Sequence, residues 1–111
     1  MLIAVIIEMA FYTLERLLNL YDGYRRAFMV AGKPLLLIQE QGKRVLILNQ
    51  CPHMQAPMER GSIQDGLIQC PVHGMRFDLL SGKALGECQE RLQFLAIAYD
   101  GNTLGVNLSD N

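Results

Sequence analysis

The chain has 111 residues, half of them hydrophobic, and its 10 basic and 11 acidic residues leave a net charge of −1. A chain of this length fits one domain that buries roughly 65% of the surface its unfolded form exposes. The balanced charge gives no indication of nucleic acid or an anionic membrane as a partner. Three cysteines, an odd number, exclude a disulfide framework. We therefore expect a single globular domain over residues 1–111.

The first ten or so residues form an uncertain extension. Residues 2–7 are apolar and are compatible with an added strand, with the start of a helix or with a segment that precedes a start at Met9. The segment lacks the basic region and the small-residue cleavage site of a signal peptide. Glu8, Glu15 and Arg16 interrupt it well before the about 18 to 20 apolar residues of a membrane span. We expect a cytoplasmic protein without a membrane partner.

Short apolar segments alternate with turn residues along the rest of the chain. The segment 35–39 is apolar enough to be a strand buried on both faces. Asp65-Gly66 predicts a two-residue hairpin turn that returns the chain to Cys70. Strands of this length, with a turn about every ten residues, predict an all-β antiparallel sandwich or barrel. The predicted strands cover residues 25–30, 35–39, 44–49, 67–69, 92–99 and 103–108.

Two short motifs contain both histidines of the chain and two of its three cysteines. Cys51-Pro52-His53 follows one predicted strand, and Cys70-Pro71-Val72-His73 follows another after sixteen intervening residues. Ligands two or three residues apart allow one tight loop to present a thiolate and a neutral imidazole to a metal. The set of Cys51, His53, Cys70 and His73 matches a Rieske [2Fe-2S] centre, in which two histidines replace two cysteines on one iron.

Zinc is the main alternative for this motif, because two cysteines and two histidines are also a zinc ligand set. Zinc fingers pair cysteine with cysteine and histidine with histidine across a short helix, whereas each loop here mixes the two. The spacing favours iron over a zinc-stabilised interaction module. Cys88 is left over and is expected to be a free thiol. We expect Met54, Met58 and Met75 to shield the metal site.

The wider pattern resembles the Rieske-type ferredoxins. Both motifs are combined with Gly61, with Gly74, with Phe77-Asp78 and with Ser81-Gly82-Lys83. The resemblance extends more loosely from about residue 17 to residue 108 and does not cover the first ten or so residues. It implies a three-sheet antiparallel β-sandwich with an inserted cluster-binding lobe at about residues 49–83.

The same resemblance implies one [2Fe-2S] cluster, with Cys51 and Cys70 on a buried iron and His53 and His73 on an outer iron. It implies a soluble electron carrier between a flavin-dependent reductase and a terminal oxygenase. With about a hundred residues the chain has no room for a catalytic domain, so we do not expect it to be an enzyme by itself. The alternative is a small Rieske-like subunit of a nitrite reductase or another larger reductase.

The chain departs from the Rieske subunits of respiratory chains at several positions. Those subunits link their loops by a disulfide, where this chain has Ala56 and Val72. They also place hydroxyl donors near the cluster, where this chain has Met75 and Phe77. Because hydrogen bonds to the sulfurs stabilise the reduced cluster, their absence implies a potential near or below about −100 mV, toward the low end of the Rieske range.

Overall fold

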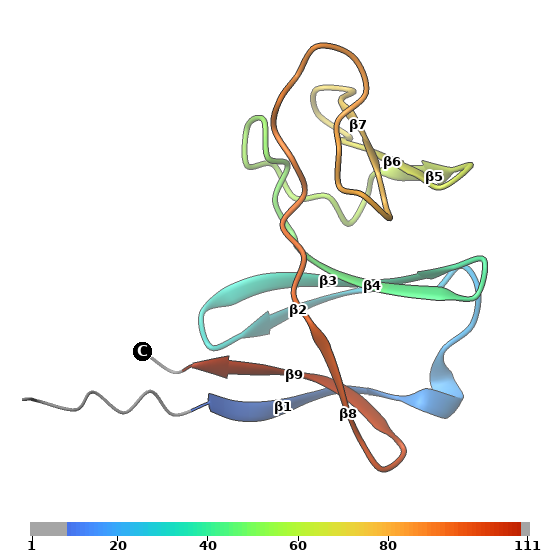
Figure 1. Ribbon diagram of the computed structural model, residues 1–111, viewed down its shortest axis with the longest axis vertical. Helices are drawn as coiled ribbons and strands as arrows, with labels where there is room; N and C mark the ends of the chain where they lie inside the picture. Colours follow the sequence, from blue (N-terminus) through green and yellow to red (C-terminus); the bar gives the residue numbers. More distant parts are fainter. Residues whose placement is uncertain (1–8, 110–111) are drawn as a thin grey trace, which may run out of the picture.

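The computed structural model describes residues 9–109, so most of the expected N-terminal extension, residues 1–8, lies outside the described part. Three antiparallel sheets of three strands each lie one above another (Figure 1): sheet A with the order β1-β9-β8, sheet B with β2-β3-β4, and sheet C with β5-β6-β7. This is the predicted three-sheet, all-β fold. The elements are β1 (Met9–Arg16), the 3-10 turn η1 (Leu17–Asn19), β2 (Arg25–Val30), β3 (Lys33–Glu40), β4 (Lys43–Leu48), β5 (Ser62–Gln64), β6 (Leu67–Gln69), β7 (Arg76–Asp78), β8 (Ile97–Asp100) and β9 (Thr103–Ser109).

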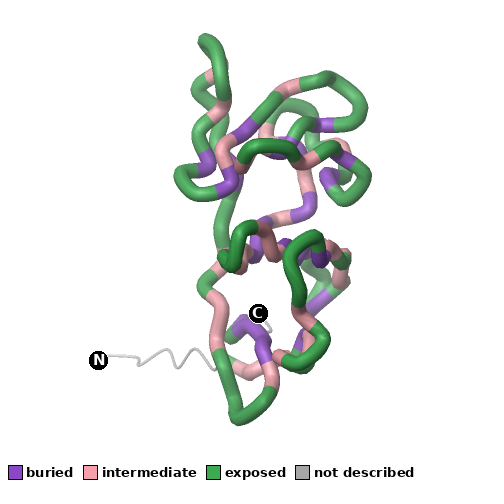
Figure 2. The backbone as a smooth tube through the Cα atoms, turned by 90° about the vertical axis from the view of Figure 1, so that its right-hand side faces the viewer, coloured by how far each residue is buried: buried purple, intermediate pink, exposed green. Residues whose placement is uncertain are grey.

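Sheet B separates two hydrophobic cores, because successive side chains of a strand point to opposite faces. Leu35 and Leu37 of β3 pack with residues of sheet A, whereas Leu36 and Ile38 pack with the lobe that carries sheet C. All four side chains are fully buried. Figure 2 shows buried stretches in both halves of the molecule. The prediction that this strand is buried on both faces is confirmed, and the double burial explains its unbroken apolar run.

Two segments differ from the sequence prediction. Residues Met9–Arg16 form a strand that pairs with β9, from Met9 opposite Ser109 to Arg16 opposite Thr103. The predicted strand over 92–99 was too long, because only Ile97 and the residues after it join β9. Residues 93–95 bond instead to β4 of sheet B, through Leu48 N to Gln93 O and Leu95 N to Leu46 O, both in the range of 2.8 to 2.9 Å. The chain thus passes from one sheet to the next within this segment.

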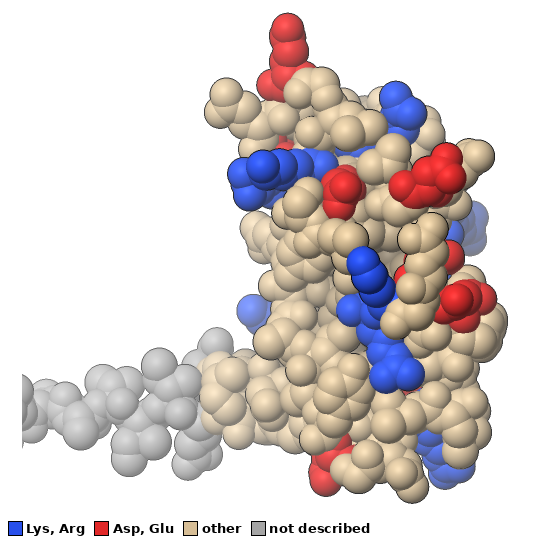
Figure 3. All heavy atoms as spheres, turned by 45° about the vertical axis from the view of Figure 1, so that its right-hand side comes forward, with Lys and Arg blue, Asp and Glu red and all other residues tan. Residues whose placement is uncertain are grey.

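Charges of both signs lie close together on one face of the molecule. On the face seen in Figure 3, Lys and Arg side chains lie next to Asp and Glu side chains. This face therefore presents no extended field of one sign that would attract a polyanion. Within residues 9–109, no helix has the length and apolar character needed to cross a membrane.

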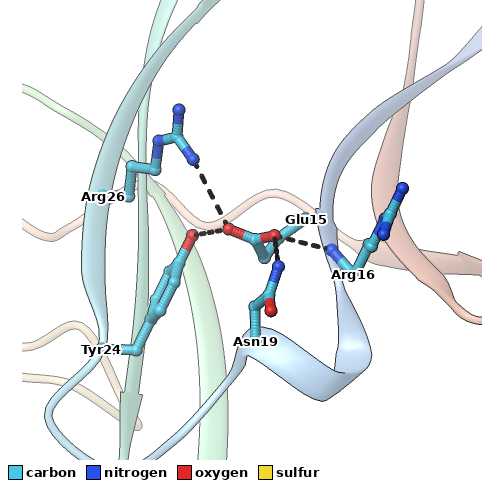
Figure 4. Close-up of polar contacts among 5 residues, drawn as sticks. All are labelled: Glu15, Arg16, Asn19, Tyr24 and Arg26. Carbon is cyan, nitrogen blue, oxygen red and sulfur yellow. Dashed lines mark hydrogen bonds and ion pairs between the residues drawn. The ribbon is translucent and has the colours of Figure 1, made fainter.

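A polar network joins β1 to β2 across the turn η1 (Figure 4). The Glu15 carboxylate accepts hydrogen bonds from Asn19 Nδ2 at 2.9 Å, from the Arg16 amide at 2.8 Å and from the Tyr24 hydroxyl at 2.8 Å, and it lies 3.5 Å from Arg26 Nη1. The bond from Asn19, followed by the other donors, lowers the pKa of Glu15 from 4.5 to about 2. Burial, followed by the bond to Glu15, raises the pKa of Tyr24 to about 12.

This network predicts that the substitution Glu15→Gln destabilises the protein in a pH-dependent way. A carboxyl group whose pKa is lowered by folding stabilises the native state above its unfolded pKa, here 4.5, and loses that effect as the pH falls toward about 2. We expect the variant to lose about 1 kcal/mol at pH 7, and the gap to the wild type to shrink below pH 4.5. Thermal unfolding of both proteins between neutral and acid pH measures the gap. A difference in stability that does not change with pH would contradict this role. An equal loss of stability in the control variant Glu59→Gln would contradict it as well.

Candidate metal centre

The two predicted ligand motifs form loops that lie side by side. Cys51 follows β4 and Cys70 follows β6, and both side chains are buried, whereas His53 and His73 are exposed. The ligand atoms of Cys51, Cys70 and His73 all lie within 4.8 Å of one another, and Cys70 Sγ is 3.8 Å from His73 Nδ1. His53 lies next to this group, with its ring centroid 5.6 Å from that of His73. The structure therefore gathers three of the predicted residues into one group and places the fourth beside it.

The two loops share one hydrogen-bonding pattern, although their histidines stand at different distances from the cysteine. In each loop the cysteine oxygen accepts a bond from the amide four residues later, and the cysteine amide donates to the oxygen five residues later. Each cysteine is thus held at both main-chain polar groups by its own loop. The bonds are Gln55 N to Cys51 O (2.6 Å), Cys51 N to Ala56 O (2.6 Å), Gly74 N to Cys70 O (3.0 Å) and Cys70 N to Met75 O (2.7 Å).

The fourth residue after each cysteine has a left-handed backbone, with φ of 61° at Gln55 and 73° at Gly74. A side chain in this conformation costs about 1–2 kcal/mol, a cost that glycine does not carry. We predict that Gly74→Ala destabilises the lobe by about that amount, and that Gln55→Gly does not. A Cβ on Gly74 would lie 3.5 Å from Gln69 Nε2, so backbone conformation rather than a collision sets the cost. Denaturant unfolding of the two variants tests this, and equal losses would contradict it.

The environment of the sulfurs fits a metal. Burial raises the pKa of the Cys51 thiol, and the neighbouring Cys70 raises it further, while the amides of Met54 and His53 donate to the sulfur and oppose the shift. Two buried thiols so close together do not both ionise unless a cation compensates them. Soft sulfur donors inside the lobe and imidazoles at its surface are the ligand set of a Rieske-type [2Fe-2S] cluster. The residues present fit that group.

The three methionines that were expected to shield the site differ in burial. Met58 is fully buried and Met75 is half-buried, and both pack in the core that contains Cys51 and Cys70, whereas Met54 is 58% exposed. Met54 lies between two further exposed loop residues, His53 and Gln55. Cys88 is an unpaired, half-buried cysteine outside the group of candidate ligands found among residues 9–109.

Two residues whose side chains bond to the main chain of residues 58–61 were missed by the sequence analysis. Asn49 is buried, and its Oδ1 accepts a hydrogen bond from the Met58 amide at 2.8 Å, which ties the start of the first loop to its end. The one signal for Asn49 in the sequence was a polar residue directly after an apolar strand. Arg25 donates to Glu59 O at 2.8 Å across 34 positions in the sequence. No local pattern indicates such a distant contact.

Comparison with known proteins gives matches over most of the chain. The family model of the Rieske [2Fe-2S] domain matches residues 10–96. The ferredoxin component of the naphthalene 1,2-dioxygenase system of Pseudomonas putida is 36% identical over 67 residues, which cover 60% of this chain and 64% of that protein. The chain therefore spans somewhat less than two thirds of the length of this curated relative.

Two solved structures have a similar fold. The ferredoxin of carbazole 1,9a-dioxygenase from Nocardioides aromaticivorans is 25% identical, with a TM-score of 0.74 over 86% of this chain and 95% of that one. A protein described as the small subunit of an NADH-dependent nitrite reductase of Mycobacterium tuberculosis is 18% identical, with a TM-score of 0.74 over 91% and 96% of the two chains. The latter likeness concerns the fold alone. Because the family model covers well over half of its residues, the chain belongs to the Rieske [2Fe-2S] domain family.

Proposed function

We propose that this chain is a one-electron carrier that takes electrons from a flavin-dependent reductase and passes them to a terminal oxygenase. The observation that carries the proposal is the contrast in burial between the two kinds of candidate ligand. Cys51 and Cys70 are no more than 1% exposed, whereas His53 and His73 lie at the surface. When bound, a [2Fe-2S] cluster supplies a centre that changes its charge by one electron. The arrangement keeps the sulfur side dry and leaves the imidazole side within reach of a partner.

The proposal assigns a role to each side chain of the site. Cys51 and Cys70 would hold one iron from within the core of the lobe, and His53 and His73 would hold the other iron at the surface. The amides of His53 and Met54 donate to Cys51 Sγ and stabilise negative charge on that sulfur. Met58, which is fully buried, excludes water from the inner side.

The side chains that replace the hydroxyl donors of the respiratory-chain Rieske subunits support a low potential. Phe77 is fully buried and Met75 is half-buried, and neither side chain has a strong hydrogen-bond donor. A reduced cluster carries one more negative charge, so fewer donors make reduction less favourable. We propose a potential near or below about −100 mV, toward the low end of the Rieske range.

The relatives and the cysteines support the proposed partners and location. The matched Pseudomonas putida protein is named as the ferredoxin component of a dioxygenase system, which supports an oxygenase as the electron acceptor and an accessory rather than a catalytic role. All three cysteines of this chain are unpaired, which suits the reducing cytoplasm. We also propose that residues 1–111 form one domain, with the cluster-binding lobe at about 49–83.

Metal analysis with visible absorption and EPR spectroscopy tests the proposed cofactor and its ligands. Freshly isolated protein should contain two irons per chain, as the cluster formula requires, and should give a rhombic EPR signal after reduction with dithionite. Reduction by a flavin-dependent reductase and oxidation by a terminal oxygenase would then establish the carrier role. A colourless protein that holds one zinc, even after anaerobic iron-sulfur reconstitution, would support the zinc-stabilised interaction module instead.

The alternative of a small reductase subunit shares the cofactor and differs in the partner. The observation that favours this alternative is the fold similarity to the nitrite reductase small subunit of Mycobacterium tuberculosis. A carrier that serves two partners in turn binds each one transiently. Stable co-purification with one large reductase, and no electron transfer to an oxygenase, would favour the subunit over the carrier.

A further inference from the structure

Arg25 connects sheet B to the segment that closes the first ligand loop. It is the first residue of β2, lies opposite Ile38 of β3, and its side chain is half-buried. Its Nη1 donates to Glu59 O at 2.8 Å and also to Gly61 O. These acceptors lie 34 and 36 positions further along the chain. Charge-assisted bonds from one guanidinium to two main-chain oxygens fix the position of residues 59–61 relative to sheet B.

The segment that Arg25 holds also touches the second ligand loop. Residues 58–61 form a tight turn, closed by a bond of 2.9 Å from Gly61 N to Met58 O. Gly61 is buried so closely against the main chain of Gln69 that a Cβ would collide with Gln69 O. Gln69 directly precedes Cys70. The Arg25 side chain therefore acts on the end of the first loop and, through Gly61, on the start of the second.

Within the described part of the chain, no ion pair joins the Arg25 guanidinium to a carboxylate. Among residues 9–109, the one ion pair joins Arg26 to Glu15, so the Arg25 guanidinium is directed at carbonyl dipoles alone. An arginine stays protonated at every physiological pH. A fixed positive charge beneath the lobe stabilises a centre that gains negative charge on reduction, more strongly when it is partly buried than at a fully solvated site.

We infer that Arg25 is a positioning residue for the metal centre, which holds the two ligand loops in place relative to each other and raises the reduction potential through its positive charge. The inference rests on the proposed electron-carrier function. It gives a structural role to a residue that lies outside both ligand motifs.

Three variants of the full-length, iron-loaded protein separate the charge of Arg25 from its hydrogen bonds. Arg25→Gln removes both, and Arg25→Lys keeps the charge on a side chain without the planar fork. Arg44→Gln is the control, because Arg44 is half-buried in the same sheet and its Nε donates to Gln39 Oε1 at 2.9 Å, away from the loops. The measurements are a redox titration, the rate of iron release to a chelator, and hydrogen exchange in residues 51–61.

In Arg25→Gln we expect the ratio of reduced to oxidised cluster at a fixed potential to fall by about threefold or more. We expect iron release and exchange in residues 51–61 to become about tenfold faster, because two charge-assisted bonds are lost. Arg25→Lys should recover most of the potential but less of the iron retention. Arg44→Gln should leave all three quantities unchanged.

The results that would overturn the inference are specific. If Arg25→Gln titrates, exchanges and releases iron as the wild type does, Arg25 does not position the centre. If Arg44→Gln lowers the potential equally, the effect belongs to net charge and not to the site. If Arg25→Lys matches Arg25→Gln in every measurement, the charge has no role. A wild-type protein without a reducible cluster would instead refute the proposed function, a failure that is visible before any variant is compared.

Discussion

Cys70→Ser is expected to abolish iron binding and to loosen the lobe while sheets A and B stay folded. Cys70 is 1% exposed, and its Sγ belongs to the group whose ligand atoms lie within 4.8 Å. A serine oxygen is a harder donor than a thiolate sulfur and is a poor substitute for it on an iron-sulfur cluster. Because ligand binding contributes folding free energy, loss of the cluster should destabilise the loops that surround it. Iron content and limited proteolysis measure the two effects, with new cleavage expected in the lobe.

Cys88→Ser is the matched control for this substitution. Cys88 is half-buried and lies outside the ligand group, so the variant should keep its iron and its EPR signal. The persistence of sheets A and B follows from the second core, in which Leu35, Leu37 and Leu104 pack without any residue of the ligand loops. A Cys70→Ser protein with an unchanged iron content and spectrum would refute the assignment of Cys70 as a ligand.

The parts of the fold that the sequence predicted are those with a local signal. The run from Leu35 to Ile38 is apolar at every position because both faces of its strand are covered, and this was recognised from the sequence. Asp65 has a φ of 54° and Gly66 one of 78°, as a two-residue hairpin turn requires. Strand β1 was missed because only one of its side chains, Leu14, is buried and its partner β9 is nearly the whole chain away.

The candidate site shows the same division between local and distant information. The spacing of cysteine and histidine indicated which residues to examine, and three of the four lie in one group. The shared hydrogen-bonding pattern of the two loops was not visible, because Gln55 occupies the position that Gly74 occupies in the other loop. The contact of Arg25 with Gly61 depends on how the lobe sits on sheet B, which no short window of sequence records.

Gly61→Ala is expected to separate the two ligand loops and to be the most damaging glycine substitution in the lobe. Its Cβ would collide with Gln69 O and would lie 3.1 Å from Met58 O. Both obstacles are main-chain atoms, so no rotamer change relieves the contact, and the turn has to move away from the strand that leads to Cys70. Overpacking of this kind costs about 3 kcal/mol. Denaturant unfolding and the rate of iron release to a chelator are the measurements.

Gly42→Ala distinguishes this collision from the general effect of removing a glycine. Gly42 has a φ of 74° and no atom within 4 Å of an added Cβ, so its substitution strains the backbone of the β3–β4 turn without touching the lobe. It should lower stability by about 1–2 kcal/mol and leave iron release unchanged. If Gly61→Ala releases iron no faster than Gly42→Ala, the close approach of the turn to Gln69 does not hold the loops together. The same result would remove the path by which Arg25 reaches the second loop, because that path passes through Gly61.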